Sequence, residues 1–93
     1  MRLDKFLKVS RIIKRRTVAK EVCDAGRVTI NGRGAKSGSE VKAGDVLKVG
    51  YGRRQLEIEV LLLAETVRAD AADTLYRVIS DVTIKSEPQF FEE

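Results

Sequence analysis

The residues of this chain that could do chemistry are cations, and they gather in one segment near its start. Between Arg2 and Lys20 lie eight basic residues: Arg2, Lys5, Lys8, Arg11, Lys14, Arg15, Arg16 and Lys20. Asp4 is the one carboxylate among the first 20 residues, and we expect it to orient a nearby arginine. A positive field this one-sided favours a polyanion as partner. We therefore predict a nucleic-acid-binding face, and we add Arg27 to its candidate residues.

The two halves of the chain differ strongly in charge. Residues 1–54 hold fifteen Lys and Arg against five Asp and Glu, whereas residues 55–93 hold three against nine. At 93 residues the chain is long enough for one modest core. We predict one RNA-binding domain over residues 1–84, and a loose tail over residues 85–93. The sequence lacks an apolar run of about 18 residues, so we expect a cytoplasmic protein.

Catalytic and metal chemistry find little support in the composition. The chain has no histidine, which excludes an imidazole base and a histidine-ligated metal site. The single cysteine, Cys23, lies on an apolar helical pattern, so we expect it to be a core residue. We therefore predict no enzymatic activity, no cofactor and no bound metal.

Two short amphipathic helices are expected to carry the cations. Apolar residues recur at mostly helical spacing: Leu3, Phe6, Leu7, Ile12, Ile13, Val18, Val22 and Cys23. The first helix is predicted from residue 2 or 3 to about Lys8, followed by a connector over residues 10–14. The second is predicted to begin at 15–17 and to stop at Gly26, where a residue without Cβ can take the left-handed conformation that ends a helix.

After Gly26 the apolar pattern alternates, which predicts strands. Residues 28–30 are predicted as the first strand, and Asn31-Gly32 is a strong hairpin signal because both residues tolerate a positive φ. Residues 33–35 would be the return strand, and residues 46–50 a third strand. The chain is therefore predicted to change from helix to antiparallel sheet directly after Gly26.

The second half is expected to complete the sheet. Residues 55–63 are predicted as the longest strand, whose buried face would hold four aliphatic residues: Leu56, Ile58, Val60 and Leu62. Residues 71–79 are predicted as a short helix with three residues that could return to the core: Leu75, Val78 and Ile79. The fold class is α+β, with two short N-terminal helices packed on a small, mostly antiparallel sheet of four to five strands and a short C-terminal helix.

Three stretches of the sequence match a known pattern. They are MRLDKFLKVSR, KRRTVAKEVCDAGRVTINGRGAK and VKAGDVLKV, and together they cover about residues 2–50. In this region the chain resembles the αL RNA-binding motif, the domain named after the fourth small-subunit ribosomal protein. Many members have Ser or Thr where Arg15 stands, so the N-cap of the second helix is expected to shift to Thr17 or to be missing.

Among single-domain members, the whole chain resembles the small bacterial factors of ribosome-associated quality control. That resemblance implies binding to large ribosomal subunits obstructed by peptidyl-tRNA, with contacts to both rRNA and tRNA. It also implies support for an RqcH-like factor that adds alanines to stalled chains, and a monomer away from the ribosome. The family's binding positions that match are Arg2 and Arg16; the other cations are added from charge and helical placement.

Three other functions stay open. The heat-shock member of the same fold also binds large subunits, although that family is longer and has a basic end. A helix-turn-helix DNA reader is less favoured because the second helix lacks exposed Asn or Gln for base edges. A protein-interaction adaptor could use the acidic second half. A base-stacking platform is not expected, because aromatic residues are scarce and Phe6 lies on an apolar stripe.

Overall fold

Helix α1, Leu3–Val9, begins the fold and is almost entirely a core element. Leu3, Phe6 and Leu7 are fully buried on the side of the helix that faces the sheet. So short a helix is stable only when packed, because its few internal hydrogen bonds do not offset the cost of nucleation. The computed structural model describes residues 1–64 and 68–83, and it confirms the predicted position of this helix.

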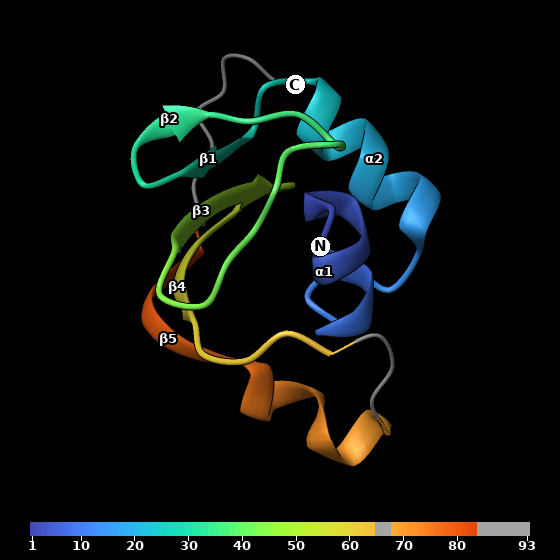
Figure 1. Ribbon diagram of the computed structural model, residues 1–93. Helices are drawn as coiled ribbons and strands as arrows, with labels where there is room; N and C mark the ends of the chain where they lie inside the picture. Colours follow the sequence, from blue (N-terminus) through green and yellow to red (C-terminus); the bar gives the residue numbers. More distant parts are fainter. Residues whose placement is uncertain (65–67, 84–93) are drawn as a thin grey trace.

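Helix α2, Arg16–Asp24, packs beside α1 (Figure 1). Ala19 and Cys23 are fully buried, which allows a close approach of the helix to the core. The helix ends as predicted, with Gly26 at a φ of +81°. Arg15 occupies the N-cap position and makes no capping hydrogen bond through its side chain, so the second expectation for the cap, that it is missing, is the one found.

The first hairpin follows the helices. Strands β1, Val28–Ile30, and β2, Arg33–Gly34, are joined through Asn31 and Gly32, whose φ angles are 52° and 83°. These values confirm the predicted hairpin, and two positive φ angles in succession are typical of a turn of type I′. The Asn31 side chain adds two hydrogen bonds, because its amide donates to Asp45 and its oxygen accepts the N–H of Val46. The hairpin is thereby fastened to the start of the third strand.

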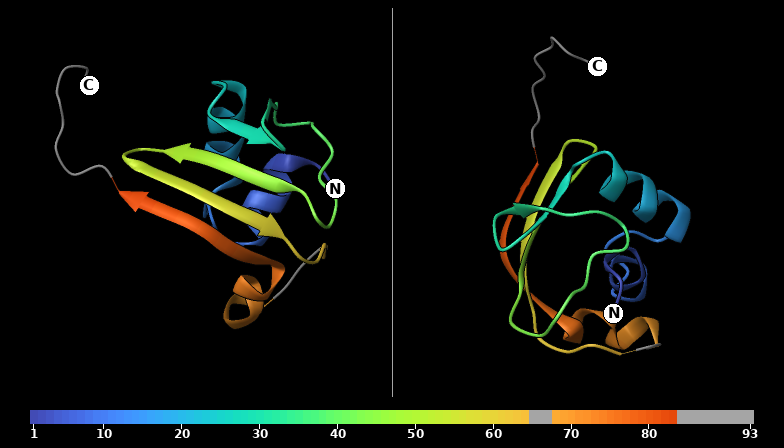
Figure 2. Two further views of the ribbon diagram at one scale, coloured as in Figure 1. Left: turned by 90° about the vertical axis from the view of Figure 1, so that its left-hand side faces the viewer. Right: turned by 45° about the horizontal axis from the view of Figure 1, so that its top comes forward.

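Strands β3, Val46–Tyr51, β4, Arg54–Val60, and β5, Tyr76–Thr83, form the rest of an antiparallel sheet in the order β2-β1-β3-β4-β5. The sheet is curved, and both helices lie on its concave side (Figure 2). Its inward side chains form one core with α1 and α2: Val28, Leu47, Val49, Leu56, Ile58 and Val60. The predicted α+β architecture with an antiparallel sheet is confirmed.

The predicted helix over residues 71–79 is helical only in its first part. A 3-10 helix, η1, spans Ala69–Leu75, and the residues that follow it belong to β5. Apolar spacing alone did not distinguish the two structures, and pairing with β4 decided for the strand, since Val78 lies opposite Ile58. Leu75 is buried as expected, but Val78 and Ile79 do not return to the core, because 48% and 44% of their surfaces are exposed.

The predicted strand over 55–63 is too long. Strand β4 ends at Val60 and is shorter than β5, because the N–H groups of Leu61 and Leu62 turn to the Leu75 carbonyl at the end of η1. Leu62 is therefore exposed and does not continue the buried face. The predicted tail over 85–93 lies outside the described residues, and the domain limits 1–84 stay a prediction.

Candidate RNA-binding interface

A buried carboxylate joins two arginines where the helices begin. Asp4 lies in the first turn of α1 with 3% of its side chain exposed. Arg2 Nε and Nη2 donate to its two oxygens at 3.2 and 3.4 Å. Arg16 Nη2, from the first residue of α2, lies 3.6 Å from Asp4 Oδ1. Both arginine side chains remain about half exposed, so each has donors left for a ligand.

The environment of Asp4 keeps it ionised. Burial by itself raises the pKa of the carboxyl, but the hydrogen bond from Arg2 and the charges of Arg16 and Arg2 lower it. The N–H of Lys5 donates a further hydrogen bond to Asp4 Oδ1 at 2.8 Å. Together these interactions hold the pKa of Asp4 below the usual value of an aspartate. The carboxylate therefore acts as a fixed anion that orients two guanidinium groups, whereas the sequence predicted this role toward a single nearby arginine.

The loop over residues 36–40 fixes the first turn of α1. The N–H groups of Leu3 and Asp4 donate to the carbonyls of Ser39 and Ser37. Gly38 comes so close that a Cβ there would lie 3.9 Å from the Arg2 guanidinium carbon. This loop thus lies beside both Arg2 and the first turn of α1.

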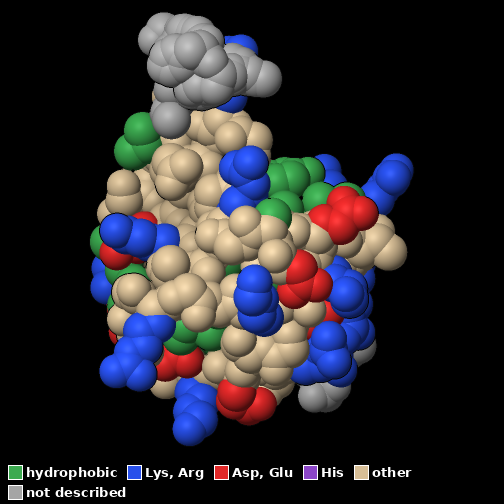
Figure 3. Space-filling model, turned by 90° about the horizontal axis from the view of Figure 1, so that it is seen from above, with side chains coloured by type: hydrophobic (Ala, Val, Ile, Leu, Met, Phe, Trp, Pro, Cys, Tyr) green, Lys and Arg blue, Asp and Glu red, His purple; other side chains and the backbone are tan. Residues whose placement is uncertain are grey.

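The remaining predicted cations lie on the two helices and their connector, except for Arg27, which follows the end of α2 and precedes β1. Most of them are exposed: Lys8, Arg11, Lys14, Arg15, Lys20 and Arg27. Lys5 is half-buried, and Lys20 pairs with Asp24 at 3.1 Å. Arg11 lies in the connector between the helices with a φ of 63°, a conformation that L side chains rarely adopt. Seen from above, Lys and Arg side chains project from the side on which α2 lies and also from the opposite side of the molecule (Figure 3).

Two residues near this surface were missed by sequence reasoning. Lys36 Nζ lies 3.4 Å from the Asp24 carbonyl at the end of α2, although the two residues are distant in the sequence. Tyr51 ends β3 and borders a cavity of about 230 Å³ that the helix connector also lines. No local sequence signal identifies either position, because both depend on packing between the helices and the sheet.

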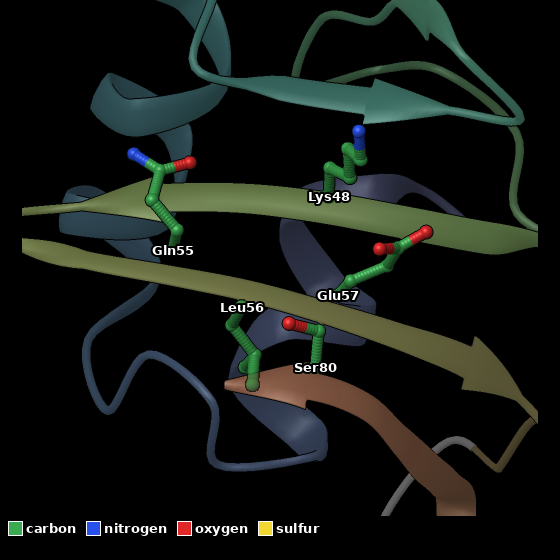
Figure 4. A pocket seen from close by; sticks show the side chains of 5 residues that line it. All are labelled: Lys48, Gln55, Leu56, Glu57 and Ser80. Carbon is green, nitrogen blue, oxygen red and sulfur yellow. The ribbon is translucent and has the colours of Figure 1, made fainter. Parts of the chain in front are cut away.

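The convex face of the sheet has a different character. Lys48, Glu57 and Ser80 are register neighbours on β3, β4 and β5, and they line a shallow cavity of about 230 Å³ with Gln55 and Leu56 (Figure 4). Positive and negative side chains alternate here, so this face lacks a one-sided field. Among residues 1–64 and 68–83, no group of three His, Cys, Asp or Glu side chains is arranged to hold a metal. In the same part of the chain, no helix has the length and apolar character to cross a bilayer.

Comparison with known proteins gives the family. Residues 1–47, which contain α1, α2 and the first hairpin, match the S4 domain. The chain belongs to the S4 domain family. This agrees with the resemblance to the αL RNA-binding motif, and it places the Asp4 junction and every candidate cation inside the matched S4 domain region.

Relatives resemble the chain over nearly its whole length. The RQC P-site tRNA stabilizing factor of Halalkalibacterium halodurans is 56% identical and covers 94% of this chain and 100% of that protein. The protein of the same name from Bacillus subtilis is 51% identical, and the match covers 87% of this chain and 94% of that protein. The structure of Vibrio cholerae Heat Shock Protein 15 has a similar fold, with a TM-score of 0.79 and 31% sequence identity. The match covers 86% of this chain and 82% of that chain.

Proposed function

We propose that this S4 protein is an RNA-binding factor of ribosome-associated quality control. It binds large ribosomal subunits that are obstructed by peptidyl-tRNA, contacts both rRNA and tRNA, and supports alanine tailing of the stalled chain by an RqcH-like factor. The observation that carries the proposal is the pair Arg2 and Arg16, held side by side by Asp4 on a basic helical surface. The relatives named RQC P-site tRNA stabilizing factor, 56% and 51% identical over most of this chain, support it.

The proposed action is electrostatic bridging without catalysis. Arginine binds phosphate oxygens through two parallel N–H groups, and Arg16 also stands at the positive end of the α2 dipole. Arg2 and Arg16 hold one phosphate backbone at the helix junction. The exposed cations of the connector and of α2 hold a second one. Two RNA molecules fastened to one small rigid domain keep a fixed relative position, which stabilises the tRNA on the subunit.

Phosphate contacts do not read sequence, so this interface recognises the shape of folded RNA. That property suits a factor that must act on stalled chains of any sequence. In this scheme the protein is a ribosome-associated cytoplasmic monomer, and its site contains nine cations: Arg2, Lys5, Lys8, Arg11, Lys14, Arg15, Arg16, Lys20 and Arg27.

The function is tested by affinity purification of the tagged full chain from cells, with sequencing of bound RNA and identification of bound proteins. Arg16→Ala is compared with Lys48→Ala, which removes a cation from the convex face of the sheet. We expect large-subunit rRNA, tRNA and an RqcH-like protein with the wild type and with Lys48→Ala, and their loss with Arg16→Ala.

Other outcomes would overturn the proposal in distinct ways. Recovery of large subunits without tRNA or a tailing factor would favour recycling of the heat-shock type. Recovery of DNA, mRNA or small subunits would contradict the choice of RNA. Retention of a protein partner in high salt, with all RNA lost, would favour an adaptor, since phosphate contacts weaken steeply with salt and apolar contacts do not.

A further inference from the structure

A cavity lies between the helix connector and the end of β3. It has a volume of about 230 Å³ and is lined by five residues: Ile12, Lys14, Arg15, Val18 and Tyr51. Ile12 and Val18 are half-buried, and 42% of the Tyr51 surface is exposed. The lining of the cavity thus combines aliphatic and aromatic side chains with two cations.

The position of Tyr51 explains why the cavity is open. Side chains alternate along β3, so Tyr51 shares the concave face with Leu47 and Val49, which are buried beneath the helices. Tyr51 lies one step beyond the helical cover. Its register partner Arg54 is bound by Asp81 through two hydrogen bonds of 2.9 and 2.8 Å.

Lys14 and Arg15, the two cations that line the cavity, differ from Arg54 in this respect. Among the described residues, neither Lys14 nor Arg15 pairs with a carboxylate. Both belong to the connector and N-cap of α2, and so to the surface to which RNA is assigned. A ligand that fits this cavity therefore has a flat or apolar part and an anionic group attached to it.

We propose that the cavity binds one unstacked nucleotide of the bound RNA. The base lies against Tyr51, Ile12 and Val18, and the phosphate is bound by Lys14 and Arg15. Unpaired nucleotides are recognised in this way elsewhere, by stacking on an aromatic ring together with backbone contacts. The inference rests on the proposed function, and it adds to the shape-reading helix surface a site that selects a flipped-out or single-stranded position.

The test is a nuclear magnetic resonance titration of the full chain with adenosine 5′-monophosphate, uridine 5′-monophosphate and inorganic phosphate. We expect either nucleotide to shift the Ile12 and Val18 methyl signals and the Tyr51 ring signals, and phosphate to shift signals of Lys14, Arg15 and other cations while leaving those of Ile12, Val18 and Tyr51 in place. Tyr51 is exposed at a strand end, so Tyr51→Phe and Tyr51→Ala are expected to fold. Tyr51→Phe should bind the nucleotide like the wild type, and Tyr51→Ala should bind about tenfold more weakly.

Several results would overturn the nucleotide site. One is an identical pattern of shifts with nucleotide and with phosphate, which would mean that only an anion binds. Another is a response of the methyl groups to an apolar peptide but not to a nucleotide. The outcome is separable from the proposed function, because large-subunit recovery with Arg16→Ala tests that function without touching the cavity. If the wild type recovers no large subunits but nucleotides still shift the signals of the cavity residues, the proposed function is overturned and the nucleotide site is supported.

Discussion

Asp4 and Arg16 come from different helices, yet the Arg16 guanidinium lies 3.6 Å from the buried Asp4 carboxylate. The same carboxylate accepts hydrogen bonds from Arg2, so one anion positions two cations at the junction of α1 and α2. Removing the anion should therefore harm binding to RNA even though the net positive charge increases. That expectation is opposite to what a purely additive view of charge predicts, and it can be measured.

The first prediction concerns Asp4→Asn. We expect RNA affinity to fall severalfold because the two guanidinium groups lose their fixed orientation. The free energy of unfolding should fall by about 2 kcal/mol, since charged hydrogen bonds are lost from a buried site. Filter binding to large subunits and chemical denaturation measure the two effects. Glu21→Gln, an exposed change of the same charge on α2, is the matched control. Equal or tighter binding by Asp4→Asn would contradict the positioning role.

The second prediction concerns acid. The folded pKa of Asp4 lies below its ordinary value, so the carboxylate stabilises the fold at neutral pH and stops doing so as the pH falls through the folded pKa. We expect the free energy of unfolding to decrease below roughly pH 5, and to decrease less steeply in Asp4→Asn. Asp24 and Asp81, whose pKa values are also lowered, leave a residual slope in both proteins. Parallel pH profiles for the two proteins would refute the assignment.

The third prediction concerns salt. If the helical surface binds phosphates, the logarithm of the RNA association constant falls linearly with the logarithm of salt concentration. Replacing one phosphate contact should reduce the size of that slope by about one. We expect this change for Arg16→Ala and for Arg2→Ala, and no change for Lys48→Ala. Titrations between low and moderate salt provide the slopes, and an unchanged slope for both arginine variants would remove them from the interface.

The fourth prediction concerns Arg11, whose φ of 63° is unfavourable for a residue with a Cβ. Arg11→Gly relieves this strain, so we expect the free energy of unfolding to stay the same or to rise by up to about 1 kcal/mol. RNA affinity should fall, because the cation is lost. Arg11→Ala loses the same cation but keeps the strain, and should weaken binding equally without stabilising the fold. Wild-type affinity in both variants would show that Arg11 is not a phosphate ligand.

The fifth prediction concerns Cys23, which is fully buried. Burial, with smaller contributions from the charges of Asp4 and Asp24, raises the pKa of its thiol to about 11. The reactive form is the thiolate, so a thiol reagent at pH 8 should label the native protein only as fast as it unfolds. Labelling rates across a denaturant series test this. Fast labelling without denaturant would contradict the core assignment.

Local signals in the sequence were enough to predict most of the first half of the fold. The apolar spacing of α1 and α2 and the positive φ at Gly26 and Asn31-Gly32 are properties of short segments. The structure confirms each of these features. The ion pair between Lys20 and Asp24 is of the same local kind, because residues four apart in a helix lie on one face.

Features that depend on distant contacts were not predictable in the same way. The start of β5, residues 76–79, was predicted as the end of a helix because its apolar residues fit both periods, and pairing with β4 is not visible in a single sequence. The sequence indicated that Asp4 would orient an arginine, but not that it would bind two arginines from both sides of the helix junction. The cavity at Tyr51 likewise arises where the helices stop covering the sheet.

Strand β3 separates the basic first part of the chain from the part that forms the last two strands. Every candidate cation precedes β3 in the sequence, whereas β4 and β5 follow it and cover its free edge. After residue 51, the inward side chains of Leu56, Ile58 and Val60 pack in one core with the helices, whereas the outward side chains of β4 and β5 point away from them. Substitutions of those outward side chains are therefore expected to leave the helical surface intact, so the convex face can change its partners independently of it.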